Sequence, residues 1–353
     1  MTVRNYEHDI KHEVLEELNR RPFKPAWWLR GRHGQTIWGP LIRKRFTHIG
    51  APRLRHERWD TPDGDFLDLL FLDGRADAPL VVLFHGMEGS PKSYYLPGFA
   101  RQFKGRGWNY AVMFFRSCGL EMNRGPKMYH LGSVEDPDYV LRHLKERHPE
   151  RPLFAIGISL GGNVLARWLG EQREQARDVV DGAAVISVPY DPVGTAPRFH
   201  RELFGVYVWH FVHTLKAKAL DLARRHPGIL DEATISRARS FYDFDNAVTA
   251  PLYGFKHAEE YWSRTVCTPL LCDIRVPTLL LTSEDDPFVL PERLPLATAE
   301  ASPWLYPQFT RKGGHAGFVQ GFWPGGARYW YEDQTVRFFE ALLRLCSKSS
   351  RPV

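Results

Sequence analysis

Continuous apolar runs of strand length alternate with amphipathic segments along most of this chain. Each run has the length and composition of a strand that is buried on both faces of a sheet. The runs lie at 79–86, 109–115, 152–159, 182–188 and 277–284. The segments between them have helical spacing, and helices are the usual crossovers between parallel strands. The pattern therefore predicts a mostly parallel sheet with helices on both faces.

The first strands are expected to depart from this parallel order. Residues 52–73 contain two strand-like segments around the turn Thr61-Pro62-Asp63-Gly64, which is typical of an antiparallel hairpin. Joined to the parallel strands, this hairpin makes the predicted sheet a mixed one, as large sheets often are.

Two regions interrupt the alternation of strands and helices. Residues 1–50 are rich in aromatic and basic residues and are expected to form an arm packed on the core, which comprises residues 51–353. Residues of about 190–270 have helical character and fall between two strands. Because structureless loops of that length are rare, this segment is predicted to be an inserted helical cap. Its apolar stretch 203–215 is a candidate for peripheral contact with a membrane.

Composition argues against several classes of protein. The 353 residues carry a net charge of +6, but Lys and Arg are interspersed with Asp and Glu, so nucleic acid is not expected as a partner. The four cysteines lack the spacing of a zinc site, and neither a metal nor a cofactor is expected. The chain has no signal-like start and no apolar stretch of about 20 residues, so a cytoplasmic protein is expected.

The segment Gly157-Ile158-Ser159-Leu160-Gly161 fits the G-x-S-x-G pattern and lies between a predicted strand and a predicted helix. A sharp turn there strains the backbone of the serine, and the glycines remove side chains that would clash. The hydroxyl would stand at the carboxyl edge of the sheet, where the next helix begins and favours negative charge. Ser159 is therefore the candidate nucleophile, and the N–H of Leu160 is a candidate oxyanion donor.

A serine nucleophile needs a base and an acid that orients the base, and both follow in the chain order Ser, Asp, His. The strand-like segment 276–288 runs into two aspartates, of which Asp286 precedes a proline and a phenylalanine, as is usual for this acid. Asp285 is the alternative. His315 lies in a glycine-rich loop after another short strand and is the candidate base.

The loop after the 79–86 strand is expected to supply the second oxyanion donor. It reads His85-Gly86-Met87, and the N–H of Met87 is the candidate because Gly86 permits a close approach. His85 itself is expected to be a structural hydrogen-bonding group. Arg116 follows the 109–115 strand and is a candidate for holding a carboxylate or phosphate of the substrate, with a structural ion pair as the alternative.

Several of these segments together resemble the YheT-like branch of the α/β-hydrolases. The resemblance rests on HGMEGSPKSYY, FRSCGLEMNR, GISLGGN, SEDDPF and GGHAGF, and it extends to GRHGQTIWGPLIRK in the arm and to the cap segment 240–262. It implies the α/β-hydrolase fold, a catalytic triad at Ser159, Asp286 and His315, and hydrolysis of carboxylic esters with medium-chain or lipid-like acyl groups. One departure is Ser117, which stands where relatives are expected to have glycine.

The expected function is cleavage of a small-molecule ester with an apolar acyl part, by way of an acyl-enzyme. Two alternatives stand beside it. The same triad could transfer the acyl group to an alcohol in place of water. Alternatively, the chain could be a non-catalytic protein of hydrolase fold that binds an apolar ligand. The sequence predicts neither the acyl length nor the oligomeric state.

Overall fold

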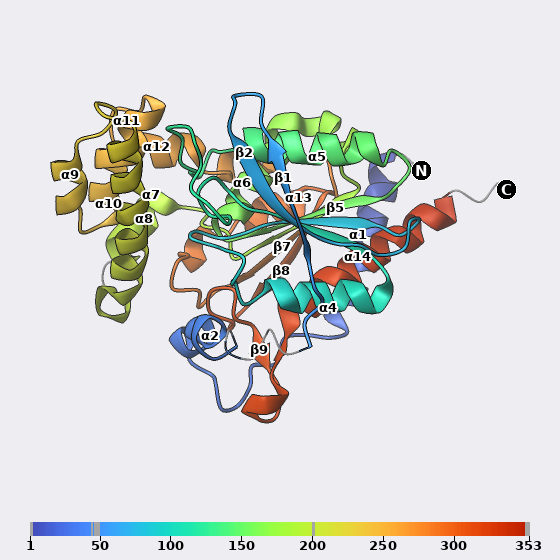
Figure 1. Ribbon diagram of the computed structural model, residues 1–353. Coiled ribbons are helices and arrows are strands. Elements are labelled where there is room, and N and C mark those ends of the chain that lie inside the picture. Colours follow the sequence, from blue (N-terminus) through green and yellow to red (C-terminus); the bar gives the residue numbers. More distant parts are fainter. Residues whose placement is uncertain (1–2, 44, 46–49, 200–201, 350–353) are drawn as a thin grey trace.

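The computed structural model describes residues 3–43, 45, 50–199 and 202–349, and an eight-stranded sheet lies at its centre (Figure 1). The strands are β1 (Arg55–Asp60), β2 (Phe66–Leu72), β3 (Leu80–Phe84), β4 (Asn109–Met113), β5 (Leu153–Ile158), β6 (Gly182–Ile186), β7 (Thr278–Ser283) and β8 (Leu305–Thr310). Their order in the sheet is β1-β2-β4-β3-β5-β6-β7-β8. β2 pairs antiparallel with β1 and β4, whereas the other pairs are parallel.

This sheet confirms the expected mixed and mostly parallel arrangement. β1 and β2 form the hairpin predicted for 52–73, and each apolar run contains one parallel strand. β3, β4, β5, β6 and β7 are buried at every residue. Burial on both faces explains why these strands are continuous apolar runs and do not alternate with polar residues.

The topology brings two chain segments together at one edge of the sheet. After β3 the chain adds β4 on one side, and it then builds β5 to β8 on the other side. β3 therefore pairs with both β4 and β5, and the carboxyl ends of β3 and β5 are neighbours. Ligand sites in open α/β sheets lie at such switch points. The predicted nucleophile turn follows β5, and the predicted oxyanion loop follows β3.

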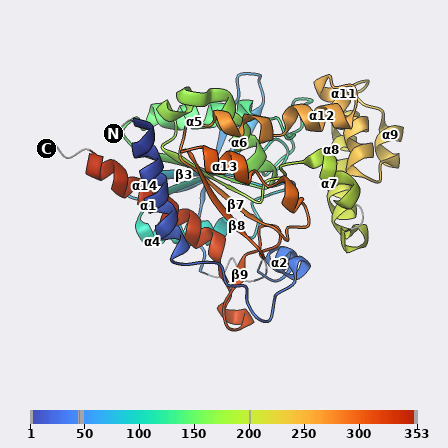
Figure 2. The ribbon, with the colours of Figure 1, turned by 180° about the vertical axis from the view of Figure 1, so that it is seen from behind.

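Helices cover both faces of the sheet (Figures 1 and 2). One face carries α4 (Leu96–Arg106) and α14 (Trp330–Ser349); the other carries α5 (Glu135–Arg147), α6 (Leu160–Gln172) and α13 (Leu296–Ala301). The ring of Phe339 stacks on Phe154 of β5 with centroids 4.5 Å apart, which packs α14 on the sheet. The indole N–H of Trp168 donates to Asp138 at 2.8 Å and joins α6 to α5.

The N-terminal helix α1 (Val3–Asn19) is packed on α14. Its residues Val14 and Leu18 are buried in the main core. The guanidinium of Arg337, on α14, donates to the backbone carbonyls of Glu17 and Leu18. The last carbonyl groups of a helix have no N–H donor within that helix. Arg337 therefore supplies hydrogen bonds that water would otherwise have to provide.

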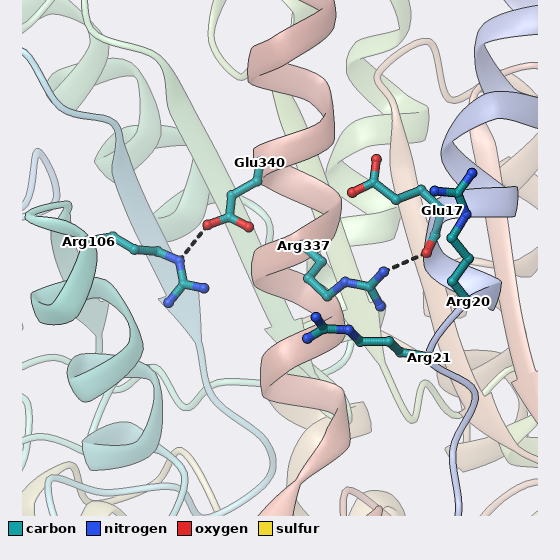
Figure 3. A pocket seen from close by; sticks show the side chains of 6 residues that line it. All are labelled: Glu17, Arg20, Arg21, Arg106, Arg337 and Glu340. Carbon is teal, nitrogen blue, oxygen red and sulfur yellow. Dashed lines mark hydrogen bonds and ion pairs between the residues drawn. The ribbon is translucent and has the colours of Figure 1, made fainter.

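A charged depression of about 510 Å³ marks this contact between α1, α4 and α14 (Figure 3). All of its lining residues are Arg or Glu. Arg106 pairs with Glu340 at 2.6 Å, and Arg344 pairs with Glu17. The first pair joins α4 to α14 and the second joins α14 to α1, so these ion pairs help to hold the three helices together.

A second part of the arm lies beside a short hairpin near the carboxyl edge of the sheet. This part consists of α2 (Arg32–Trp38) and the π-helical turn η1 (Gly39–Arg43). The hairpin is formed by β9 (Val319–Gln320) and β10 (Arg328–Tyr329), with the turn η7 (Pro324–Gly326) between them. Figures 1 and 2 both show α2 next to β9.

Between β6 and β7 the chain leaves the sheet and forms a group of helices at the left of Figure 1. They are α7 (Pro192–Phe199), α8 (Val206–Arg225), α9 (Glu232–Arg237), α10 (Phe241–Phe244), α11 (Ala250–Tyr253) and α12 (Ala258–Thr265). These helices occupy the span for which the sequence predicts a cap. Phe199 and Tyr207 of the group pack on Phe288, from the loop after β7, in a small apolar cluster of their own. In the described part of the chain, no helix is both long and apolar enough to span a membrane.

Candidate active site

Ser159 occupies the sharp turn between β5 and α6. Its φ of 55° and ψ of −117° form a strained combination for a residue with a side chain. A Cβ atom added to Gly157 would lie 2.4 Å from the carbonyl oxygen of Gly161, and one added to Gly161 would lie 2.4 Å from that of Phe84. Backbone packing therefore requires both glycines of the motif. The turn presents Ser159 at the carboxyl edge of the sheet.

The side chains of Ser159, His315 and Asp286 meet at this edge, although they are far apart in the sequence. His315 Nε2 lies 2.9 Å from Ser159 Oγ, and His315 Nδ1 lies 2.8 Å from Asp286 Oδ2. Asp286 is buried, and its other oxygen accepts the N–H of Phe288 at 2.8 Å. The Phe288 ring packs edge-on against the imidazole, with centroids 4.3 Å apart. This geometry suits proton transfer from the serine to the imidazole.

Asp285, the alternative acid, makes a different set of contacts. Its carboxylate accepts hydrogen bonds from the Ser283 hydroxyl at 3.0 Å and from the N–H of Gly314 at 2.9 Å. Lys312 lies 3.8 Å away. These contacts fasten the loop that carries His315 to the loop after β7. The structure thus brings Asp286, and not Asp285, to the imidazole.

Residues of the arm also hold the His315 loop, a role that the sequence analysis did not predict. The hydroxyl of Thr36, on α2, accepts the N–H of His315 at 2.9 Å. The buried side-chain amide of Gln35 bonds to both the N–H and the C=O of Val319. Residue type alone does not indicate that a glutamine or a threonine in the arm supports the site. The resemblance of GRHGQTIWGPLIRK to the family was the one sequence feature that could have indicated this role.

The two residues predicted to donate to the oxyanion follow neighbouring strands, β3 and β5. Met87 follows β3, and Leu160 is the first residue of α6, where helical N–H groups have no acceptor within the helix. A Cβ atom added to Gly86 would lie 3.2 Å from the Cβ of Ser159, so the loop after β3 approaches the serine closely. Met87, Leu160 and Ser159 all line the same cavity.

His85 is fully buried and has a structural role, as expected. Its Nδ1 lies 2.7 Å from the C=O of Gly86, and its Nε2 accepts the N–H of Phe115 at 3.1 Å. Burial lowers the pKa of His85 to about 4, so the ring is neutral at pH 7. These bonds fasten the loop after β3 to the end of β4.

Arg116 does not line the cavity, and the prediction that it holds a substrate anion is wrong. Its guanidinium binds both oxygens of Asp136 at 2.8 Å and an oxygen of Asp63 at 3.0 Å. A buried guanidinium paired with several carboxylates has its donors already in use. The alternative, a structural ion pair, is the one found. Ser117 is likewise outside the cavity lining and exchanges hydrogen bonds with Asn123.

A largely buried ion pair joins the cap to the loop that carries Met87, and the sequence analysis did not anticipate it. Lys218, on α8, lies 2.7 Å from the carboxylate of Glu88. The hydroxyl of Tyr129 donates to the same carboxylate at 2.7 Å and accepts the N–H of Glu88 at 2.8 Å. Glu88 has a φ of 55°, so these contacts stabilise a strained turn next to Met87.

We expect the substitution Lys218→Met to lower the free energy of unfolding by about 3 kcal/mol, because it leaves the Glu88 carboxylate buried without its cation. The turnover number should also fall, by about tenfold, since the neighbouring Met87 N–H loses its support. Urea denaturation and steady-state kinetics measure the two effects. Adding Glu88→Gln removes the unpaired charge and should recover most of the lost stability. Equal stability of the single and double variants would contradict this account.

Ser159 and His315 open into a cavity of about 700 Å³ that lies against the cap. The cavity is large enough for a small-molecule ligand. Cap, arm and loop residues all contribute to its wall, which is mostly apolar. Its aromatic members include Phe199, Tyr207, Phe211, Phe241, Trp262 and Phe288.

Two histidines near this cavity, the buried His85 and the half-buried His130, make the stability depend on pH. Burial, reinforced by the cations Lys218 and Arg167, lowers the pKa of His85 and His130 to about 4. In the unfolded chain these pKa values are about 6.5. The unfolded state therefore binds more protons between pH 6.5 and 4, and stability falls as the pH is lowered through that range. Asp245 has the opposite effect on stability. Burial raises its pKa to about 6, so its contribution to stability increases as the pH is lowered.

We expect the free energy of unfolding to be about 3 kcal/mol lower at pH 4 than at pH 7. Each of the three shifts corresponds to about 3 kcal/mol, and the two histidines outweigh the one aspartate. Urea denaturation at the two pH values measures the difference. The control His130→Asn removes one histidine and should abolish most of the dependence. A wild-type protein that is equally stable at both pH values would exclude this explanation.

This chain is similar to several known proteins. The family described as serine aminopeptidase, S33, matches residues 76–303. The candidate esterase YheT of Escherichia coli (strain K12) is 35% identical over 312 residues, covering 85% of this chain and 87% of YheT. Medium-chain fatty acid ethyl ester synthase/esterase 2 of Saccharomyces cerevisiae is 28% identical, covering 76% of this chain and 64% of that protein. An esterase of Pyrococcus furiosus shares the fold, with a TM-score of 0.55 at 17% identity over 85% of this chain and 93% of that one.

The sheet order, the serine turn and these matches define a carboxylic ester hydrolase of the α/β-hydrolase fold. The predicted fold is confirmed. Within that superfamily, the chain belongs to the YheT-like branch, as its sequence segments indicate. Among the residues that the structure describes, no group of three or more His, Cys, Asp or Glu side chains could hold a metal ion.

Proposed function

We propose that this enzyme hydrolyses carboxylic esters with apolar, medium-chain or lipid-like acyl groups, and that Ser159, His315 and Asp286 are its catalytic triad. The observation that carries the proposal is the 2.9 Å contact between Ser159 Oγ and His315 Nε2 at the wall of a mostly apolar cavity. A serine hydroxyl is a weak nucleophile until an adjacent base accepts its proton.

In the first half of the reaction, His315 takes the proton of Ser159 while Oγ attacks the ester carbonyl carbon. The N–H groups of Met87 and Leu160 donate hydrogen bonds to the oxyanion that forms. Asp286 stabilises the imidazolium and keeps Nε2 directed at the serine. The tetrahedral intermediate then breaks its bond to the alkoxide, His315 returns the proton to that oxygen, and the alcohol leaves.

In the second half, His315 takes a proton from a water molecule, and the oxygen of that water attacks the acyl carbon. The resulting intermediate breaks its bond to Ser159, and the proton passes from His315 to the serine oxygen. The carboxylic acid is released, and the enzyme returns to its starting state. Every proton in this cycle is carried by His315.

The proposed substrate class rests on the cavity wall and on the name of the yeast relative, which refers to medium-chain fatty acids. Apolar walls favour the binding of apolar acyl groups, because their burial removes apolar surface from water. A peripheral contact of the cap with a membrane belongs to the same proposal. The cytoplasmic location expected from the sequence stays a prediction.

A second candidate function is acyl transfer to an alcohol, which the synthase activity in the name of the yeast relative favours. In that reaction an alcohol replaces water in the second half of the cycle. Adding ethanol to the assay separates the two functions. A transferase would form ethyl ester in excess of free acid at millimolar ethanol, whereas a hydrolase would form mostly acid.

A fluorophosphonate probe tests the proposed triad. The probe should label the wild-type protein, and mass spectrometry should place the adduct on Ser159. The Ser159→Ala variant should stay unlabelled. A series of p-nitrophenyl esters from acetate to palmitate should show its highest kcat/KM at medium chain length. A folded wild-type protein that neither reacts with the probe nor cleaves any ester would favour the non-catalytic, ligand-binding alternative.

A further inference from the structure

Three large apolar side chains line the cavity and are also exposed to solvent. They are Leu41 in η1, which is 57% exposed, and Val206 and Trp209 at the start of α8, which are 51% and 67% exposed. A side chain that faces both the cavity and the solvent must lie at the entrance. The entrance therefore lies between the arm and the first turn of α8.

A second group of exposed aromatic side chains lies on the hairpin formed by β9 and β10. Phe322 and Trp323, in its turn, are 87% and 63% exposed, and Trp27 of the arm is 63% exposed. The indole N–H of Trp27 donates to the C=O of Phe322 at 2.8 Å, so the three residues are neighbours. Aromatic side chains that stand together in water commonly mark a contact surface.

The helix α2 connects the hairpin to the cavity entrance. Trp28 donates to the C=O of Gly321 at 3.1 Å, and its ring packs on Trp38 of α2 with centroids 4.7 Å apart. His33, also on α2, lies 3.2 Å from the hydroxyl of Tyr207 on α8. Figures 1 and 2 show α2 between α8 and β9. We call the six exposed apolar residues of the two groups the entrance rim.

The segments that form the entrance rim contain basic but no acidic residues, although Arg32, Arg43 and Lys218 are paired with Glu202, Glu332 and Glu88 of neighbouring segments. The sequence has no Asp or Glu in residues 18–56, 203–220 or 301–331, although each of these segments contains Lys or Arg. Lys24 and Lys92 are exposed, and Lys92 also lines the cavity. Aromatic side chains next to Lys and Arg, without acidic residues, are the combination that binds anionic lipid surfaces.

We propose that the entrance rim docks on an anionic lipid bilayer. Phe322, Trp323 and Trp27 enter the headgroup region, the basic residues face the lipid phosphates, and the cavity entrance faces the membrane. This inference rests on the proposed function, since an apolar ester would then pass from the bilayer to Ser159 without crossing water. The occupant is a bilayer and not a second copy of the chain, because a symmetric dimer would bring two surfaces of the same charge together.

Vesicle flotation tests this surface. The wild-type protein should float with vesicles that contain phosphatidylglycerol, float much less with pure phosphatidylcholine vesicles, and dissociate in 0.5 M salt, because salt screens the attraction. The double variant Phe322→Ser, Trp323→Ser should bind the anionic vesicles at least tenfold more weakly. The matched control is Ile229→Ser, an exposed apolar residue beyond the far end of α8, which should bind like the wild type.

Hydrolysis of soluble p-nitrophenyl butyrate, measured on the same preparations, separates the two proposals. The double variant should keep wild-type activity, because neither residue lines the cavity. Wild-type protein that stays off anionic vesicles, or a double variant that binds them as well as wild type, would overturn the docking surface. So would a wild-type dimer that the double variant dissociates, with no vesicle binding. Vesicle binding without any ester hydrolysis would instead refute the proposed function and leave the docking surface standing.

Discussion

Replacement of Ser159 by alanine is expected to lower kcat for ester hydrolysis by roughly 10⁶-fold while the protein stays folded. The hydroxyl lies 2.9 Å from His315 Nε2, and without it no acyl-enzyme can form. Residual activity would come from the oxyanion donors acting on a direct attack by water. Steady-state kinetics with p-nitrophenyl butyrate measures the loss, and circular dichroism checks the fold.

The matched control for this experiment is Ser90→Ala. Ser90 lines the same cavity, but its hydroxyl accepts the N–H of Lys92 and does not contact the imidazole. We expect its kcat to stay within about threefold of the wild type, since a single exposed hydrogen bond is lost. A Ser159→Ala variant that keeps more than one per cent of the wild-type turnover would show that another group is the nucleophile.

The strands and the serine turn could be predicted because their signals are local. β3 to β7 are buried on both faces, so each is a continuous apolar run that the sequence displays directly. A Cβ atom at Gly157 would lie 2.4 Å from the carbonyl oxygen of Gly161, which belongs to the same short motif, whereas the contact that requires Gly161 is with the distant Phe84. Chain order then predicted a histidine at 315 and an aspartate at 285 or 286, because the carboxyl ends of parallel strands meet at one edge of the sheet. The proline and phenylalanine that follow favoured Asp286, which is the aspartate found beside the imidazole.

The contacts that support these residues could not be predicted, because they join segments that lie far apart in the chain. Thr36 bonds to His315 across 279 residues, and Lys218 pairs with Glu88 across 130 residues. Neither threonine nor lysine carries a local signal for such a partner. Arg116 shows the same limit: its place at a strand end left both a substrate contact and a structural ion pair open, and only the distant partners Asp136 and Asp63 decide for the ion pair.

The variant Asp286→Asn is expected to lower kcat by about 10⁴-fold while KM changes little. Asp286 Oδ2 accepts a hydrogen bond from His315 Nδ1 at 2.8 Å, which leaves Nε2 free to accept the serine proton. An asparagine amide can donate to Nδ1, and the ring would then carry its proton on Nε2 and could no longer act as a base towards Ser159. Steady-state kinetics with a soluble ester measures the effect.

Asp285→Asn is the matched control, because the two residues are neighbours in one loop and the substitution is the same. Asp285 accepts hydrogen bonds from Ser283 and Gly314, both of which an asparagine oxygen can still accept. Its kcat should therefore fall by less than tenfold. If the two variants lost activity equally, the loop as a whole would be responsible and Asp286 would have no special role. If Asp285→Asn lost more, the acid would be Asp285, and the His315 ring would have to turn away from its position in this structure during the reaction.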